Sequence, residues 1–402
     1  MKNFEIPQFY KSNFITLIKN MRKDIDPRKK DFTPTLLDFG PVRFFIARHF
    51  GFCYGVENAI EVAYKTIESN PGKRIFLLSE MIHNPGVNEE LQKLGVNFLM
   101  DTSGKHLIEW NELTSNDVVI IPAFGTTIEI ENKLNELGIN PYKYNTTCPF
   151  VEKVWNRSKQ LGEQSYTIII HGKHYHEETR ATFSHTTKTA HSVIVRNIEE
   201  TKILAEIILG KKTHAEFYNI FAGKYSTGFN VDEHLIKIGV VNQTTMLASE
   251  TQEISELLRE AMTIKYGAEN IKDHFAETRD TLCYATNDNQ DATYGLLKEN
   301  ADLAIIVGGY NSSNTSHIVE LCEEKLPSYF ISSEEKIISN KLIKHFDIHT
   351  KEEKESYNFI PDKKPVDIIL TSGASCPDAV VESVLRKIHS FFNDAKPVDK
   401  VV

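Results

Sequence analysis

The chain has few cysteines, no long apolar run and no excess of positive charge, and each shortage excludes a class of protein. No run of about eighteen consecutive apolar residues occurs, which argues against a membrane-spanning helix. The formal net charge of −9 removes the general positive field that attracts proteins to nucleic acids or anionic membranes. Five cysteines is an odd number spread over a long chain, which argues against a disulfide scaffold. We therefore expect a globular protein of a reducing compartment, the cytoplasm.

Residues 1–41 lack the features of a targeting segment. They contain no long apolar core and no small-residue cleavage site, and Glu5, Asp24 and Asp26 make them too acidic for a transit peptide. Because chain ends are commonly exposed, we expect residues 1–41 to form a solvated N-terminal extension and residues 391–402 a C-terminal tail.

Short apolar stretches alternate with amphipathic stretches from residue 42 onward. Val42–Ala47 precedes the helical stretch Tyr54–Glu68, and Val118–Ala123 precedes Ile128–Leu137. This alternation predicts an α/β fold with mostly parallel sheets. The hydrophobic content of 41% is enough for a substantial core.

Four cysteines occupy one kind of position, at or near the start of a predicted helix, and they are Cys53, Cys148, Cys283 and Cys376. There the helix macrodipole and free backbone N–H groups are expected to lower the thiol pKa and favour the metal-binding thiolate. Their spacing of about one α/β unit predicts a pseudo-repeated architecture with one thiolate in each unit.

An inert cysteine at a strand–helix junction is the alternative, because the sequence has no CxxC pair of the kind that makes metal motifs specific. The fifth cysteine, Cys322, lies inside the predicted helix Ile318–Leu326 and is expected to be a small core residue.

A run of small polar residues, Gly308–Ser316, separates the apolar Leu303–Val307 from a predicted helix. Ligands of open α/β sheets bind at the carboxyl ends of strands, and free N–H groups at a helix start hold phosphate well. Similar segments occur at residues 371–375 and 242–245. The alternative is ordinary helix N-capping, although that needs only one Ser or Asn per helix.

Three imidazoles and two carboxylates crowd together in His171–Glu178, directly after the apolar Thr167–Ile170. Such a segment suits an acid/base site, a metal site or a solvated polar loop. A zinc hydrolase built on His171, His174 and His176 is therefore one hypothesis.

Taken together, these segments resemble the 4-hydroxy-3-methylbut-2-enyl diphosphate reductases, the LytB family, over roughly residues 43–390. The resemblance rests on eight ordered motifs: GFCYGVENAI at 51–60, EMIHNP at 80–85, TTCPFVEKVW at 146–155, HGKHYHEET at 171–179, NQTT at 242–245, LCYATNDNQDA at 282–292, NSSNT at 311–315 and SGAS at 372–375. The form of these motifs is similar to the longer, cyanobacterial and plant-like branch.

The resemblance implies one 4Fe-4S cluster per chain, held by Cys53, Cys148 and Cys283, with its fourth iron open to substrate. It also implies three α/β units arranged as a cloverleaf around the cluster. We place these units at residues 42–147, 148–282 and 283–390.

The activity implied is reductive dehydroxylation of (E)-4-hydroxy-3-methylbut-2-enyl diphosphate to isopentenyl and dimethylallyl diphosphate, the last step of the non-mevalonate isoprenoid pathway. Glu178 matches the family's proton donor, with Thr244 as its relay partner. The positions that match substrate-binding residues are His83, His176, Thr244, Ser312, Ser313, Asn314 and Ser375. The implied partner is an electron donor such as ferredoxin or flavodoxin, with no nucleic acid and no membrane.

Two positions depart from the family pattern. Phe124 stands where many members carry a histidine, so another donor, His174 or a backbone amide, is expected to compensate. Cys376 replaces a small residue beside Ser375, and a resting-state ligand to the fourth iron is one role for its thiol. A zinc-dependent hydrolase and a non-catalytic diphosphate-binding protein are the two alternative functions.

Overall fold

The computed structural model describes residues 4–276 and 281–401. Residues 1–3 of the predicted extension, 277–280 of the predicted second unit and 402 of the predicted tail lie outside this description. The chain divides into two compact units. The first comprises Met1–Glu61, Ile82–Leu91 and Tyr284–Val402, and the second comprises Val62–Met81 and Gln92–Cys283.

The first unit is built on a five-stranded sheet in the order β1-β2-β15-β10-β11. Its strands are β1 (Thr35–Asp38), β2 (Val42–Ile46), β10 (Leu303–Val307), β11 (Ser328–Ile331) and β15 (Val366–Ser372). All neighbours are parallel except the edge strand β1, which runs antiparallel to β2. The central strands β10 and β15 are buried along their whole length, as expected for strands covered on both faces.

A small antiparallel sheet in the order β12-β13-β14 belongs to the same unit. Its strands are β12 (Ile337–Ser339), β13 (Leu342–Asp347) and β14 (Glu352–Tyr357). Strand β14 is an edge strand, and its mostly exposed, charged side chains are of the kind that discourages edge-to-edge pairing with another chain.

The helices of the first unit are α1 (Asn13–Ile25), α12 (Tyr284–Leu296), α13 (Ser313–Glu323) and α14 (Asp378–His389). Helices α2 (Tyr54–Ser69) and α3 (Pro85–Lys93) begin in this unit and end in the second. The short 3-10 helices of this unit are η1 (Gln8–Tyr10), η3 (Glu334–Lys336) and η4 (Val398–Lys400), whereas η2 (Trp110–Glu112) belongs to the second unit.

Contrary to the expectation of a solvated extension, part of the described N-terminal segment is packed against the first unit. Helix α1 buries Phe14, Ile15 and Ile18 and contacts α14. The ammonium of Lys19 forms an ion pair with Asp378 at 2.7 Å. The partner surface of this segment lies near the other end of the chain, so its burial is not visible in the local sequence.

The second unit contains two parallel sheets, in the orders β4-β3-β5 and β7-β6-β8-β9. Its strands are β3 (Ile75–Leu77), β4 (Val96–Phe98), β5 (Val118–Ile120), β6 (Thr167–His171), β7 (Ser192–Val195), β8 (Ile238–Asn242) and β9 (Phe275–Ala276). Its helices are α4 (Ile128–Glu136), α5 (Pro149–Gly162), α6 (Glu177–Thr187), α7 (Ile198–Ile208), α8 (His214–Ile220), α9 (Val231–His234), α10 (Ala248–Tyr266) and α11 (Ile271–His274).

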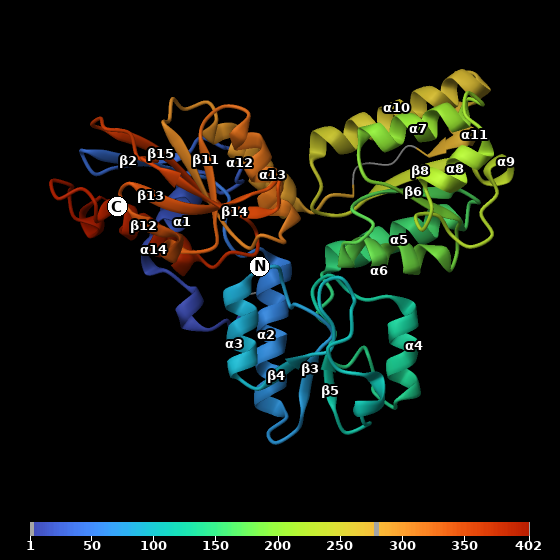
Figure 1. Ribbon diagram of the computed structural model, residues 1–402, viewed down its shortest axis with the longest axis horizontal. Coiled ribbons are helices and arrows are strands. Elements are labelled where there is room, and N and C mark those ends of the chain that lie inside the picture. Colours follow the sequence, from blue (N-terminus) through green and yellow to red (C-terminus); the bar gives the residue numbers. More distant parts are fainter. Residues whose placement is uncertain (1–3, 277–280, 402) are drawn as a thin grey trace. The chain divides into compact units, whose positions relative to one another are not determined.

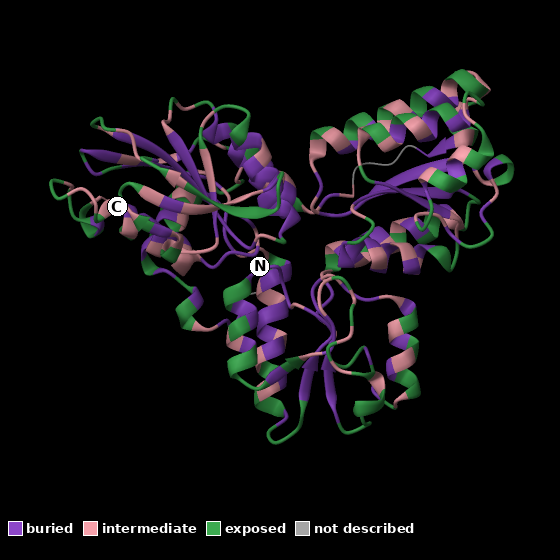
Figure 2. Ribbon diagram, in the orientation of Figure 1, coloured by how far each residue is buried: buried purple, intermediate pink, exposed green. Residues whose placement is uncertain are grey.

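Helices cover both faces of the larger sheet of the second unit, with α7 and α10 on one face and α5 and α6 on the other (Figure 1). Successive residues of β6 alternate between two cores. Ile169 packs in the first, whereas Ile168 and Ile170 pack in the second. The strands are buried and the outward helix faces exposed (Figure 2). Polar loops at the strand ends are therefore held by a rigid, close-packed base.

The predicted fold class, α/β with mostly parallel sheets, is confirmed. Strand β2 and helix α2 lie within a residue of the predicted ranges. The boundaries of the three predicted units stay a prediction. Across residues 4–276 and 281–401, none of the helices combines the length and the hydrophobicity needed to cross a bilayer.

Candidate functional site

Cys53 lies in a turn between β2 and α2 that is tied to the end of β15. The Gly51 N–H donates to the Ser372 hydroxyl at 3.1 Å, and the Cys53 N–H donates to the Ala374 carbonyl at 3.1 Å. Gly51 has a φ of +83°, which an L side chain rarely adopts, and a Cβ there would also collide with Asp378. The tight turn leaves the Cys53 thiol half-exposed at the start of a helix.

A second polar turn of the first unit contains His83, which is buried. The Ser375 hydroxyl donates to the His83 carbonyl at 3.2 Å, and the Asn84 side-chain amide donates to the Ser375 carbonyl at 2.9 Å. A Cβ on Gly309 would collide with the His83 carbonyl, so only glycine permits this close backbone approach. Three predicted substrate-binding segments, around residues 83, 309 and 375, are therefore brought together.

The phosphate-cradle loop, Gly308–Asn314, leads from β10 into α13. Ser312 caps the helix by accepting the Thr315 N–H at 3.3 Å. The Asn314 side-chain oxygen accepts from the Ala374 N–H at 3.0 Å and from the Asn289 amide at 3.1 Å. Asn314 is 4% exposed, yet its Nδ2 has no hydrogen-bond partner among the described residues. A buried donor of this kind has a high cost unless a ligand accepts from it.

In the second unit, Cys148 is the N-cap residue of α5, and its N–H donates to the Ala123 carbonyl at 2.9 Å. Before it, Tyr142–Tyr144 form a turn and Asn145 forms an isolated parallel bridge with Ile121. The side chains of Asn140 and Asn145 each accept the backbone N–H two residues ahead. The junction is therefore a turn that leads into a helix, with a half-exposed thiol.

Cys283 precedes α12 and is held by the loop after β8. Its N–H donates to the Thr244 carbonyl at 3.1 Å. The nearby Thr281 exchanges two hydrogen bonds with Asn242. The Thr281 hydroxyl accepts the Asn242 N–H at 2.8 Å, and the Asn242 side-chain oxygen accepts the Thr281 N–H at 2.9 Å. The Cys283 thiol is also half-exposed.

The predicted lowering of the thiol pKa at helix starts is wrong for Cys148 and for Cys376. Burial raises the pKa of Cys148 to about 12, although the N–H groups of Phe150 and Val151 act in the opposite direction. The charges of Cys283 and Glu178 raise this pKa further. Desolvation therefore outweighs the helix terminus here, and a cation at the thiol would be needed to favour the thiolate.

Glu178 and Thr244 form a buried pair. One Glu178 oxygen accepts the Thr244 N–H at 2.6 Å, and the other accepts the Thr244 hydroxyl at 3.0 Å. His176 caps α6 by accepting the Glu178 N–H on Nδ1 at 3.2 Å. With Glu178 only 2% exposed, this carboxyl group is held in one orientation and shielded from water.

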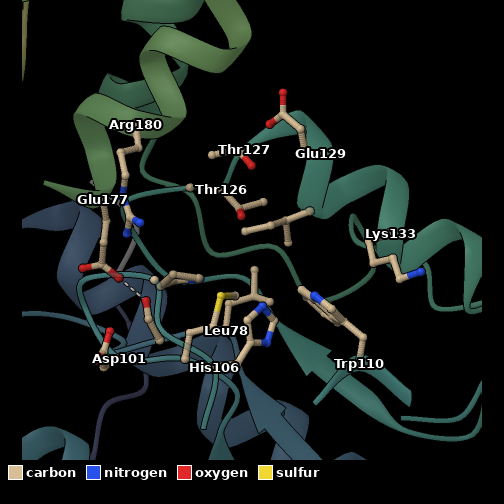
Figure 3. Close-up of a pocket in the computed structure, with 16 residues that line it drawn as sticks. Leu78, Asp101, His106, Trp110, Thr126, Thr127, Glu129, Lys133, Glu177 and Arg180 are labelled. Atoms are coloured by element: carbon tan, nitrogen blue, oxygen red, sulfur yellow. Dashed lines mark hydrogen bonds between the residues drawn. The ribbon is translucent and has the colours of Figure 1, made fainter. Parts of the chain in front are cut away.

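The neighbouring acid, Glu177, has a different role. Its carboxylate accepts a hydrogen bond from Ser79, marked by the dashed line in Figure 3. Both residues line a cavity of about 420 Å³ that also contains Trp110, Lys133 and Arg180. The adjacent acids therefore differ in their geometry: Glu177 accepts from Ser79, whereas Glu178 accepts from Thr244.

The three imidazoles of the zinc hypothesis lie in different environments. His171 is fully buried and contacts Thr251 through Nδ1 at 3.0 Å. His174 is exposed and lines a separate cavity of about 740 Å³ with His191. Among the described residues, no three His, Cys, Asp or Glu side chains are grouped closely enough to hold a metal ion.

Phe124, which stands in place of the expected histidine, packs edge-on against the His176 ring, with the two ring centroids 5.7 Å apart. The contact fixes the imidazole orientation but supplies no donor of its own. His174 is exposed elsewhere, so nothing in its position supports the expectation that it compensates.

The remaining two cysteines are buried, in contrast to the other three. Cys322 lies in the core as expected. Cys376 is 0% exposed, and its thiol donates to the Pro377 carbonyl at 3.6 Å. Burial also raises the pKa of Cys376, and its full burial separates it from the three half-exposed cysteines.

Two positioning residues were absent from the sequence prediction. Asn289 orients Asn314, and Asn242 anchors the segment that leads to Cys283. Both stand within quoted motifs, NDNQDA and NQTT, but their roles depend on partners distant in the sequence.

Comparisons with known proteins agree on one family. The sequence profile described as LytB protein matches residues 44–389. The chain is 42% identical to the 4-hydroxy-3-methylbut-2-enyl diphosphate reductase of Thermosynechococcus vestitus, over 87% of this chain and 85% of that protein. It is 38% identical to the enzyme of the same name from Prochlorococcus marinus, over 95% of this chain and 91% of that protein.

Among solved structures, the E-1-hydroxy-2-methyl-but-2-enyl-4-diphosphate reductase from Plasmodium falciparum is similar, with a TM-score of 0.61. The two chains are 20% identical, and the alignment covers 85% of this chain and 86% of the other. This likeness supports the fold.

Proposed function

This chain belongs to the LytB family, and from that premise we propose that it reduces (E)-4-hydroxy-3-methylbut-2-enyl diphosphate to isopentenyl and dimethylallyl diphosphate. The substrate takes up two electrons and two protons, its allylic C–O bond breaks, and water leaves. The observation that carries the proposal is the Glu178–Thr244 pair, a buried proton source beside two half-exposed cysteines.

Cys53, Cys148 and Cys283 fit a 4Fe-4S cluster by their chemistry. They are the three half-exposed cysteines of five, and each stands at a helix start. To bind a metal, Cys148 would have to lose its proton; burial opposes this and the charge of a bound cation would favour it. Bound there, the cluster would supply single electrons and, with only three thiolates, an open iron for the substrate.

Glu178 supplies the proton to the leaving oxygen in this proposal. Its two hydrogen bonds from Thr244 fix the carboxyl group, and the Thr244 hydroxyl provides a route for proton exchange. Burial keeps bulk water from competing for that proton. His176 holds the first turn of α6 in place through its bond to the Glu178 N–H.

The diphosphate is bound by neutral donors rather than by Lys or Arg. Ser312, Ser313 and Asn314 follow the end of β10 and open α13, where free N–H groups favour an anion. His83 and Ser375 bind from the adjacent turns. The Asn314 Nδ2 is buried without a partner among the described residues, and a phosphate oxygen would accept a hydrogen bond from it and offset the cost of that burial.

The electrons come from a separate protein in this proposal, a ferredoxin or a flavodoxin. The sequence has no GxGxxG motif for a nicotinamide or flavin cofactor of its own. Five free cysteines support a reducing compartment, and we propose the cytoplasm.

The decisive experiment is anaerobic purification followed by iron counting and turnover with a strong one-electron reductant. We expect brown protein with about four irons per chain. Cys53→Ser should remove the colour, whereas Cys322→Ser should keep it. A colourless protein after anaerobic iron and sulfide reconstitution, or one that binds the diphosphate without turnover, would contradict the proposal.

A further inference from the structure

The hairpin strands β13 and β14 hold one side chain of the phosphate-cradle loop. Tyr310 lies in that loop, and its ring stacks on Phe346 of β13, with ring centroids 4.5 Å apart and an interplanar angle of 10°. Phe330 of β11 meets the Tyr310 ring edge-on, with centroids 5.2 Å apart. The phenol ring is thereby fixed between the hairpin and the parallel sheet.

The hydroxyl end of Tyr310 is fixed as well. It donates a hydrogen bond of 2.9 Å to the Glu353 carboxylate on β14. Lys336 forms an ion pair with the same carboxylate, and its hydrogen bond is the largest cause that lowers the pKa of Glu353. The carboxylate therefore stays charged near neutral pH, and its bond to Tyr310 is of the stronger, charge-assisted kind.

The other side of the loop is confined by backbone contacts. Gly309 approaches the turn of His83 and Asn84 so closely that no Cβ fits. The Gly308 N–H donates to the Ile331 carbonyl at 2.9 Å, and the Ser312 N–H donates to the Gly309 carbonyl at 2.9 Å. The loop thus lies between the turn at residues 83–84 and the hairpin, and Tyr310 is its contact with the hairpin.

We propose that Tyr310, held by Phe346 and Glu353, is a positioning residue for diphosphate recognition. By fixing Gly309 and Ser312, the hairpin keeps the donors of the cradle in their binding geometry before the ligand arrives. Such preorganisation reduces the ordering cost of binding. The inference rests on the proposed function, because it takes the cradle to be the diphosphate site.

The test compares Tyr310→Phe and Glu353→Gln with the control Glu355→Gln. Tyr310→Phe keeps the ring stack and removes only the hydroxyl. Glu355 lies on the same face of β14, two residues from Glu353, and pairs with Lys344 at 3.4 Å instead. Inorganic pyrophosphate is the probe, titrated calorimetrically into the reconstituted protein, with KM and kcat measured in parallel.

We expect Tyr310→Phe and Glu353→Gln to weaken pyrophosphate binding about three- to tenfold and to raise KM by a similar factor. The kcat should stay within about twofold, because only the preorganisation of the loop is lost. Glu355→Gln should change neither. The direction is informative, because removal of a negative charge should by itself strengthen the binding of an anion. Weaker binding by Glu353→Gln therefore reports on loop geometry.

Unchanged pyrophosphate binding in both variants, with only a lower melting temperature, would overturn the inference in favour of a purely structural role. Equal weakening by Glu355→Gln would overturn it too. Ser313→Ala separates this failure from that of the proposed function. If Ser313→Ala weakens binding and Tyr310→Phe does not, only the positioning role fails. If Ser313→Ala has no effect on binding, the phosphate-cradle loop is not the diphosphate site.

Discussion

Replacement of Glu178 by glutamine tests the proposed proton donor directly. The amide oxygen of glutamine can accept the Thr244 N–H, now bound at 2.6 Å, and its NH₂ group can donate to the Thr244 hydroxyl, now at 3.0 Å. Folding and substrate binding should therefore change little. The loss of a general acid should lower kcat by about 10²-fold or more, equal to about 2.7 kcal/mol of barrier.

The matched control is Glu177→Gln, which makes the same chemical change one residue earlier. Glu177 accepts a hydrogen bond from Ser79 and has no proton-transfer role in the proposal, so its substitution should lower kcat by less than about fivefold. Steady-state turnover under anaerobic conditions, with iron content and pyrophosphate affinity for each variant, gives the comparison. Near-normal kcat in Glu178→Gln, or an equal loss in Glu177→Gln, would refute the reasoning.

Three further outcomes are expected. Asn314→Asp keeps the side-chain oxygen that binds Ala374 but turns the free donor into a carboxylate oxygen, so KM should rise about tenfold or more; an unchanged KM would exclude Asn314 as a diphosphate ligand. Burial lowers the pKa of His49 to about 4, so between pH 6.5 and 4 only the unfolded chain gains this proton. On acidification through that window the free energy of unfolding should fall by up to about 1.4 kcal/mol per pH unit from this group, a contribution that His49→Gln should abolish in denaturant titrations. Ile15→Ala should cost about 2 to 5 kcal/mol of stability, and the exposed Leu17→Ala far less; equal effects would mean that α1 is not packed.

The candidate site was largely predictable where chemistry is local in the sequence. Glu178, Thr244 and the cradle loop all follow buried strands, and the ends of parallel strands collect polar loops at one edge of a sheet. Resemblance to a family then gave each residue a role that its position alone left open. Their joint action in catalysis stays a prediction.

Burial was the quantity that the sequence predicted least well. Helix α1 carries Phe14, Ile15 and Ile18 on one face, yet its covering helix α14 lies near the other end of the chain. The Cys148 thiol has the helix N–H groups that were expected, but tertiary packing partly buries it, and this desolvation reverses the sign of its pKa shift. Both errors have one origin, because desolvation depends on partners that are distant in sequence.

The pairing of β2 with β15 also constrains the order of events during synthesis. Arg43 on β2 and Asp367 on β15, which share a salt bridge, are 324 positions apart in the chain. The turn around Cys53 depends on Ser372 and Ala374, so it cannot close until the ribosome has made almost the entire polypeptide. Segments of the second unit emerge and can fold long before then. If Cys53 binds the proposed cluster, its turn would be complete only after almost the whole chain has been made, and a chain truncated before Ser372 would lack it.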